Sequence, residues 1–341
     1  MNEEVMRKQD TNTFKRRPAQ EWKLRKPISL KLIGTLLLFS ILLTISAKNT
    51  EIDKGIKETI GAVGAILGIG ESSVITGSKA LIRNCFPLVL ELQTEVNRIN
   101  NFDPNNLPWL SHVETRELRE YSALTDSWTT YTAQWLIEPF GYAKRVAWKM
   151  IETIEMAIWG TILSILISLP LAYFGAKNLG HSKILYLVAR GISSFNRAVP
   201  DMIYALFFVL MYGFGPVAGI MALGVHTSGF LGKFFADEVE NADPNTQEAL
   251  KCIGSNRIKV LLFAVLPQVL PQMFSYAQYI LERNVRMATV LGIVGAGGIG
   301  MELKGRWDMF NYGHVSTILL AIFITVIGLE YLTQKIRKKL F

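Results

Sequence analysis

Charged side chains occur inside a long hydrophobic segment in the last quarter of the chain. Glu282, Arg283 and Arg286 are the only charged residues between positions 268 and 291. An arginine guanidinium binds an oxyanion through two parallel hydrogen bonds, and charges at membrane depth usually face a bundle interior or an aqueous cavity. These residue types in this setting predict a path for a small anion.

A structural role for the same residues remains the alternative. Glu282 and Arg286 are four positions apart, so they share one helix face and can form an ion pair. Arg283 is rotated about 100° from Glu282 and has no partner at helical spacing.

A second group of polar residues interrupts another uncharged run. His226, Thr227 and Ser228 follow one another within residues 202–232, which contain no Asp, Glu, Lys or Arg. These three side chains are further candidates for the path. The alternative is that His226 bonds to a neighbouring helix.

A glycine-rich stretch imitates a cofactor motif. Gly295, Gly297, Gly298 and Gly300 belong to GAGGIG, which satisfies the dinucleotide-binding pattern G-x-G-x-x-G. That motif requires a strand before it and a βαβ unit around it, and neither fits a hydrophobic segment of helical length. We therefore expect a glycine-rich bend that lets backbones approach closely, and no cofactor.

Metal binding and disulfide formation find no support in the sequence. The four histidines are scattered, and the two cysteines, Cys85 and Cys252, are far apart. No metal-ligand spacing occurs.

The elements that carry these residues have the composition of membrane helices. Half of the residues are hydrophobic, and the mean hydropathy is +0.26. Residues 156–176 are uncharged, and a hydrocarbon core of about 30 Å needs roughly 20 such residues in a helix. The sequence predicts an all-α membrane protein with six transmembrane helices, at about 29–47, 152–176, 188–213, 216–236, 268–291 and 313–333.

The third and fourth predicted helices meet at a tight hairpin. Gly213 and Gly215 permit the turn, and Pro216 suits the first turn of the next helix. The third is the least apolar at its start, where Arg190 and Arg197 precede Pro200.

Basic residues predict the orientation. Residues 1–27 and the last seven residues are rich in Lys and Arg, which favours a cytoplasmic location for both termini. The same count places Cys85 outside and Cys252 inside. The net charge of +8 is then a topology signal, and nucleic-acid binding is not expected.

The N-terminal part divides into three predicted segments. Residues 1–27 form a cytoplasmic tail, and 28–47 form the first transmembrane helix, with a cleaved signal peptide as the alternative. Residues 48–147 form an extracytoplasmic insertion. Within it, the alternation of Glu and Arg over 114–120 predicts a solvated helix. This insertion is either a helical cap or a contact surface for a binding protein.

A polar loop between the fourth and fifth predicted helices has the character of a docking surface. Residues 237–265 are hydrophilic at first and end in an apolar run before Pro267. Glu248, Ala249, Gly254, Leu266 and Pro267 resemble the coupling loop of ABC-importer permeases, which follows E-A-A, three residues, G, nine residues and I-x-L-P. Leu250 and Ala264 depart from that pattern.

Further runs within 148–341 resemble the phosphonate and phosphite branch of these permeases. They are RAVPD at 197–201, GFGPVAG at 213–219, HTSG at 226–229 and ERNVRMAT at 282–289. The resemblance implies the type I importer fold of the methionine-importer permeases, with a five-helix core at 148–341. The insertion at 48–147 exceeds what that family leads us to expect.

The resemblance also implies a function and partners. The chain would be the permease subunit of an ABC importer for phosphonate or a related small oxyanion in the bacterial plasma (inner) membrane. Two copies would form the pathway, two ATPase subunits would each receive one coupling loop, and an extracytoplasmic binding protein would deliver the anion. The chain has no G-x-x-x-x-G-K-[ST] loop of its own. A secondary transporter or channel for a small anion, without an ATPase, is the alternative.

Overall fold

The computed structural model describes residues 30–50, 52–66, 72–100, 102–104, 106–122, 126–179 and 182–340. The predicted cytoplasmic tail, 1–27, lies outside these residues, as do the first two residues of the predicted first transmembrane helix. The chain divides into two compact units, Met1–Ala80 and Leu81–Phe341, and each is treated separately.

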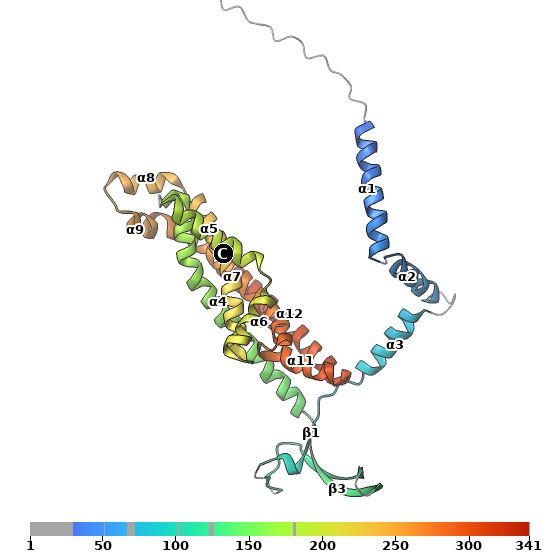
Figure 1. The fold of residues 1–341 in the computed structure, drawn as a ribbon. Helices are drawn as coiled ribbons and strands as arrows, with labels where there is room; N and C mark the ends of the chain where they lie inside the picture. Colours follow the sequence, from blue (N-terminus) through green and yellow to red (C-terminus); the bar gives the residue numbers. More distant parts are fainter. Residues whose placement is uncertain are drawn as a thin grey trace, which may run out of the picture. The chain divides into compact units, whose positions relative to one another are not determined.

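The first unit contains two helices and the start of a third. They are α1 (Leu30–Asn49), α2 (Ile52–Ile66) and α3 (Ser73–Cys85), of which α3 runs into the second unit (Figure 1). Within α1 and α2, residues 33–49 and 54–66 form an apolar pair bent by 76°. The described part of the predicted first transmembrane helix coincides with α1.

The second unit is built from nine further helices among the described residues. In chain order these are α4 (Gly141–Gly175), α5 (Lys183–Ala198), α6 (Asp201–Tyr212), α7 (Pro216–Asn241), α8 (Pro244–Cys252), α9 (Arg257–Val260), α10 (Leu266–Leu291), α11 (Gly298–Asp308) and α12 (Tyr312–Leu340). Short 3-10 or π turns stand at Val96–Arg98, Lys177–Leu179, Leu261–Val265 and Gly292–Val294.

Glycines bring α4 and α7 into close contact at the centre of this unit. A Cβ added at Gly160 would lie 2.8 Å from Leu223, and one added at Gly224 would overlap Leu163. Small residues allow helices to approach in membranes, where packing supplies much of the attraction between them. Leu223 and Gly224 of α7 are both buried at this contact.

The predicted third transmembrane helix, 188–213, is wrong as one continuous element. It is divided into α5 and α6 at Val199 and Pro200, and Val199 is extended, with φ −80° and ψ 123°. A proline disfavours helical geometry in the residue before it and lacks the N–H that would continue the ladder. The predicted hairpin that follows is confirmed, because Gly213 and Gly215 have positive φ and Pro216 opens α7.

Among the described residues, three helical stretches are long and apolar enough to cross a membrane. They are Gly141–Gly175, Arg257–Val294 and Tyr312–Ile336, and the bent pair in the first unit adds a fourth if it is one span. Helix α6 is apolar but has only 12 residues. The count of six transmembrane helices stays a prediction.

An antiparallel sheet precedes the helical core. Its strands are β1 (Leu92–Glu95), β2 (His112–Ser122) and β3 (Ser127–Glu138), in the order β1-β3-β2. The prediction of a helix at 114–120 is therefore wrong. Arg116 pairs with Glu114, two positions away, at 2.7 Å, which is the spacing of one strand face rather than of a helix.

The physical reason lies in β3 rather than in β2. Strand β3 contains Trp128, Thr129, Thr130, Tyr131 and Thr132, residue types that favour strands. It pairs with β2 from Ser127 to Ile137. The charges of β2 give no clear apolar period of their own, so the partner strand determines the structure.

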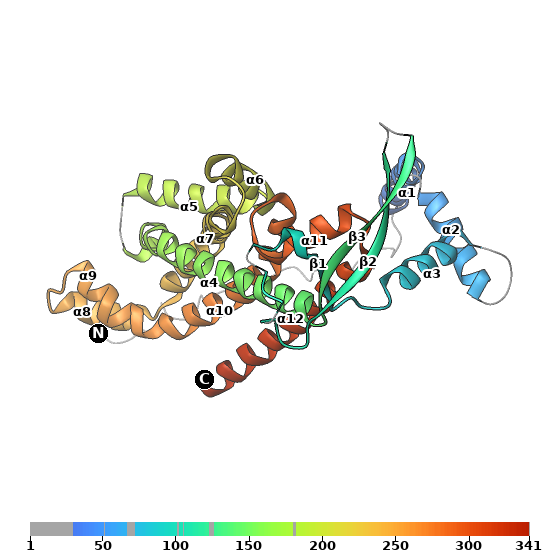
Figure 2. The ribbon, with the colours of Figure 1, turned by 90° about the horizontal axis from the view of Figure 1, so that it is seen from below.

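The sheet and the α8–α9 segment lie at opposite ends of the second unit (Figures 1 and 2). The sheet end is fixed by hydrogen bonds: Tyr142 N–H donates to Leu90 O at 3.0 Å, and Thr317 Oγ1 donates to Val89 O at 2.8 Å. At the other end, Val260, Ala264 and Val265 pack against the far end of α4 and α7.

Candidate functional site

The predicted coupling loop forms a short helix, a tight turn and a second short helix. Asp243 caps α8 by accepting from Asn245 N–H at 3.0 Å. After α8, Gly254 has φ +79°, and Ser255 N–H donates to Leu250 O at 3.1 Å. A left-handed glycine with such a bond is the usual way to end a helix.

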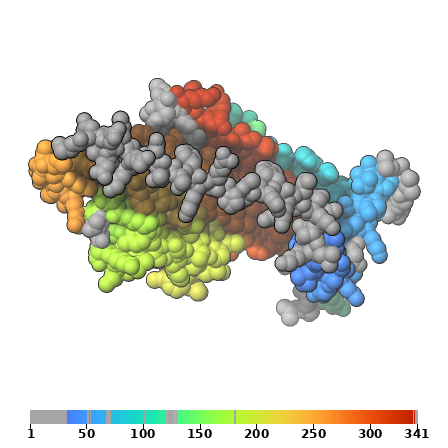
Figure 3. Space-filling view, turned by 90° about the horizontal axis from the view of Figure 1, so that it is seen from above, coloured from blue at the N-terminus to red at the C-terminus, as the bar shows by residue number. Residues whose placement is uncertain are grey.

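The loop exposes one side and anchors the other. Glu248 and Ala249 are exposed, and Ile253 and Ile258 are 77% and 57% exposed. Gln247 is buried and donates to Ala242 O at 3.1 Å. In Figure 3 the orange atoms of this segment form one end of the second unit. The exposed side of this loop is therefore partly apolar, and the opposite side is held by a buried contact.

Leu266 and Pro267 stand apart from that surface. They begin α10, directly after the wide π turn at Leu261–Val265. Proline lacks the N–H that a helix would use, and a widened turn accommodates the missing bond. We therefore assign these two residues to the joint between the loop and α10.

His226 links three helical segments around a buried point of α7. Its Nε2 lies 3.2 Å from Nη2 of Arg283 in α10, and its Nδ1 lies 3.0 Å from the carbonyl oxygen of Val199, at the α5–α6 break. A guanidinium can only donate, so Nε2 accepts and Nδ1 carries the hydrogen that is donated to Val199. This ring is therefore neutral in the arrangement observed.

Arg283 has a partner after all, on another helix. Besides His226, its guanidinium carbon lies 4.5 Å from the centre of the Phe230 ring. Helical spacing within α10 could not show this, because the two contacts come from α7. The structure thus brings together His226 and Arg283, two of the predicted path residues.

Thr227 and Ser228 do not join them. Thr227 donates to Leu223 O at 2.5 Å, and Ser228 donates to Val225 O at 2.7 Å, so both hydroxyls bond to their own helix. Ser228 also accepts from Asn196 Nδ2 at 3.2 Å, which links α7 to α5. Their observed contacts are those of helix packing.

Glu282 and Arg286 form the ion pair that their spacing allows. Arg286 Nη1 lies 2.7 Å from Glu282 Oε1, and the two side chains are 43% and 23% exposed. This pair lies on the less buried face of α10, whose packed face carries Asn284, Val285 and Ala288.

The glycine-rich stretch forms a bend that only glycine accommodates at several positions. Gly295, Gly297 and Gly298 have φ of +95°, +90° and +68°. A Cβ at Gly297 would lie 2.7 Å from the backbone nitrogen of Pro216, and one at Gly300 would overlap Thr289 O. The bend thus lies against the start of α7.

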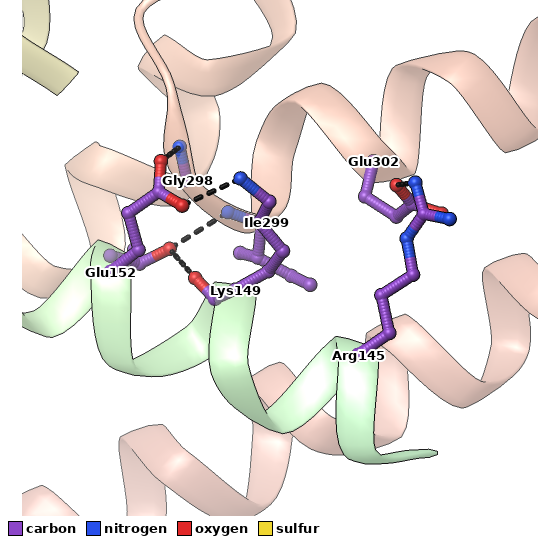
Figure 4. Close-up of polar contacts among 7 residues, drawn as sticks. Arg145, Lys149, Glu152, Gly298, Ile299 and Glu302 are labelled. Atoms are coloured by element: carbon purple, nitrogen blue, oxygen red, sulfur yellow. Dashed lines mark hydrogen bonds and ion pairs between the residues drawn. The ribbon is translucent and has the colours of Figure 1, made fainter. Parts of the chain in front are cut away.

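Two side chains of α4 hold the N-terminus of α11 (Figure 4). Glu152 Oε1 accepts from Gly298 N–H at 3.1 Å, and Thr153 Oγ1 accepts from Ile299 N–H at 2.8 Å. Lys149 Nζ lies 2.6 Å from the other oxygen of Glu152. The donors that would bind a pyrophosphate in a dinucleotide fold are taken by the chain itself.

Sequence reasoning missed these α4 residues. The available signal was Glu152 beside Thr153, a few residues before the uncharged run that begins at Met156, where a carboxylate needs a partner. The sequence gives no indication that the partner is a helix N-terminus 146 positions away. Farther along, Glu302 bridges Arg145 and Arg306 at 3.0 Å each, which ties α4 to α11 again.

Comparison with known proteins gives one family and a set of relatives. Residues 164–337 match the model of the family described as binding-protein-dependent transport system inner membrane component. The chain is 48% identical to the protein named "Putative phosphite transport system permease protein HtxE" of Stutzerimonas stutzeri, over 74% of this chain and 98% of that protein. It is 38% identical to the phosphate-import permease protein PhnE of Mycolicibacterium smegmatis, over 57% of this chain and 36% of that protein.

Solved structures give the fold. A chain of the inward-facing MetNI methionine ABC transporter superposes with a TM-score of 0.51 at 21% identity, over 57% of this chain and 96% of that chain. An amino acid ABC transporter chain superposes with a TM-score of 0.50 at 15% identity. The predicted fold class, a type I importer transmembrane fold, is confirmed.

Proposed function

Because the chain belongs to the family of binding-protein-dependent transport system inner membrane components, we propose that it is the permease subunit of an ABC importer for a small phosphorus oxyanion. The observation that carries the substrate class is the 48% identity to a relative named for phosphite transport, across 98% of that relative. Phosphonate, phosphite and phosphate share a tetrahedral anionic group, and this shared chemistry defines the class.

The motor of this importer is a separate protein. The sequence contains no phosphate-binding loop of the type that cradles ATP. The exposed side of α8 and the turn at Gly254 suit a docking surface, because they are anchored by buried contacts on the opposite side. We assign one coupling loop to each of two ATPase subunits, with Glu248 and Ala249 at the contact.

The opposite end of the second unit would then face outward. With both termini cytoplasmic, the sheet β1–β3 lies on the extracytoplasmic side of the bacterial plasma membrane, where an anion-loaded binding protein docks. A second copy of the chain completes the pathway, and its wall includes the less buried face of α10. His226, Arg283 and the Glu282–Arg286 pair contribute the polar groups of that wall.

Reconstitution tests this proposal. The chain is inserted into liposomes together with its cognate ATPase and binding protein, and uptake of radiolabelled phosphite, methylphosphonate and phosphate is followed. We expect uptake of at least one anion that requires both ATP and the binding protein. Uptake that persists without the ATPase would instead identify a secondary carrier or channel.

A further inference from the structure

Two arginines from different helices converge on one aromatic ring. The guanidinium carbon of Arg283, in α10, lies 4.5 Å from the centre of the Phe230 ring, and that of Arg197, in α5, lies 5.3 Å from it. The two guanidinium carbons can therefore be no more than about 10 Å apart. Phe230 belongs to α7, so three helices meet at this ring.

Among the residues that the structure describes, neither guanidinium forms an ion pair with a carboxylate, and the acidic residue that acts electrostatically on the neighbouring His226 is Asp201. Arg190 and Arg286 have acidic partners at 2.6 to 2.9 Å, but no such pair includes Arg197 or Arg283. Aromatic faces attract cations, yet each such contact is worth only about 0.5–2 kcal/mol. Two guanidinium charges within about 10 Å of each other and without an ion-pair partner repel each other, and a bound anion would relieve this repulsion.

One donor at this point has no partner in the chain. The Nε–H of Arg197 is buried and donates no hydrogen bond within the described residues. Burial of a charged group's donor without a partner is costly, so natural sites usually supply one. Arg283, by contrast, donates one hydrogen bond, from Nη2 to His226 Nε2, and its guanidinium has further N–H donors.

Backbone geometry holds Arg197 in place. A Cβ at Gly229 would lie 2.7 Å from Ser193 O and 3.1 Å from Arg197 N, so the missing side chain lets α5 approach α7. Directly after Arg197, α5 ends at the Val199–Pro200 break. The carbonyl oxygen of Val199 accepts a hydrogen bond from Nδ1 of His226. The same break therefore positions Arg197 and also His226, which in turn orients Arg283.

We propose that Arg197 and Arg283 together form a two-guanidinium binding site for the tetrahedral oxyanion on its way through the protein, with Phe230 and His226 as positioning residues. The site rests on the proposed import function and makes it specific, because it assigns the substrate contact to α5 and α10. Arginine suits this role because its planar fork matches two oxygens of one anion.

The test uses the reconstituted complex and whichever of phosphite, methylphosphonate and phosphate the wild type imports. Arg197→Gln removes the charge, Arg197→Lys keeps it without the fork, and Lys183→Gln is a control at an exposed position of the same helix. We expect Arg197→Gln to lower the maximal uptake rate at least tenfold, because bonds to charged groups are typically worth a factor of ten or more. Arg197→Lys is expected to recover part of the rate.

Three further readouts separate the site from a packing role. The concentration of loaded binding protein at half-maximal uptake should stay unchanged in Arg197→Gln, since docking occurs elsewhere, and complex assembly and basal ATP hydrolysis should persist. Phe230→Tyr, which keeps a ring, should transport, whereas Phe230→Leu should be slow. Wild-type rates in Arg197→Gln, or failure of both Arg197 variants to assemble, would overturn the site while leaving the import function intact. Failure of the wild type to import any of the three anions would overturn the function itself.

Discussion

At the residue scale, the backbone donors of α11 depend on two side chains of α4. Thr153 is fully buried, donates to Lys149 O at 2.8 Å and accepts from Ile299 N–H at 2.8 Å. A hydroxyl can make both bonds at once, and a methyl group of the same shape can make neither. Replacing Thr153 by Val therefore removes the hydrogen bonds while the size of the side chain stays nearly the same.

Thr153→Val is expected to destabilise the protein by about 1–3 kcal/mol, because Ile299 N–H would be left buried and unpaired. Thr153→Ser keeps the hydroxyl and should cost about 1 kcal/mol or less, mainly from the lost methyl group. Thermal unfolding of the detergent-solubilised protein measures both. Equal melting temperatures for Thr153→Val and Thr153→Ser would show that the bond does not matter.

Gly297 gives a second residue-scale prediction. Its φ of +90° and the 2.7 Å approach of an added Cβ to Pro216 N both disfavour any side chain. Gly297→Ala should cost at least about 2 kcal/mol, from left-handed strain and overlap together. Gly305→Ala is the matched control, because Gly305 lies inside α11 with open space around it and should gain up to about 1 kcal/mol. Comparable melting temperatures for the two variants would contradict the strain argument.

The sequence was informative about residues to the extent that their partners are local. The pairing of Glu282 with Arg286 follows from a spacing of four on a helix, and it is present. The contact of Arg283 with His226 spans 57 positions and that of Glu152 with Gly298 spans 146. Such contacts depend on which helices pack together, and no local spacing encodes them.

At the scale of elements, turn chemistry was the most reliable guide. Glycine and proline predicted the hairpin before α7, because φ > 0 and a missing N–H leave few alternatives. The same chemistry at Pro200 should have divided 188–213, yet the apolar run hid the break. At β2 the failure had another cause, since exposed charges carry no period and the pairing strand β3 decides the structure.

The turn after α8 allows two roles of Gly254 to be separated. Asn tolerates left-handed geometry, whereas Val does not, and nothing lies within 4 Å of an added Cβ. If the glycine only ends the helix, Gly254→Asn should transport normally and Gly254→Val poorly. If the ATPase surface leaves no room for a side chain, both variants should insert and assemble but lose substrate-stimulated ATP hydrolysis and uptake.

We expect assembly without coupling for Gly254→Asn, Gly254→Val and also Gly254→Trp. The reason is that the residues around this turn, Glu248, Ala249 and Ile253, are exposed and available to the ATPase. Normal coupling in Gly254→Trp would remove the main support for the docking assignment. Glu248→Ala should only weaken coupling, since an exposed ion pair to the ATPase is worth about 1 kcal/mol or less.

At the scale of the whole molecule, orientation is the property still to be measured. Cys85 and Cys252 are free thiols, and they lie at the sheet end and at the loop end of the second unit. A membrane-impermeant thiol reagent applied to intact cells should label Cys85 and spare Cys252. Single-cysteine variants identify the labelled position, and permeabilised cells serve as the control in which Cys252 reacts. Labelling of Cys252 from outside would reverse the topology.

Charge and hydropathy predicted the fold class of the whole chain but not its outer parts. Long uncharged runs and basic loops are consequences of the bilayer itself, so they are readable in any sequence that crosses it. Strand β2, by contrast, forms only by pairing with another strand: Leu118 pairs with Tyr131, 13 positions away, and Glu114 pairs with Trp135, 21 positions away. The role of the insertion at 48–147 stays a hypothesis for the same reason.

The occupied N-terminus of α11 has a kinetic consequence for an importer of oxyanions. Glycine turns that aim free N–H groups outward at a helix start are natural traps for phosphate-like ions. In this chain the carboxylate of Glu152 already accepts the hydrogen bond from Gly298 N–H at the start of α11. A cargo ion that reaches this end of the bundle meets backbone donors that Glu152 and Thr153 already occupy, so these donors are not available to bind it. An importer that left such donors free would be slowed by its own cargo as the cargo accumulated.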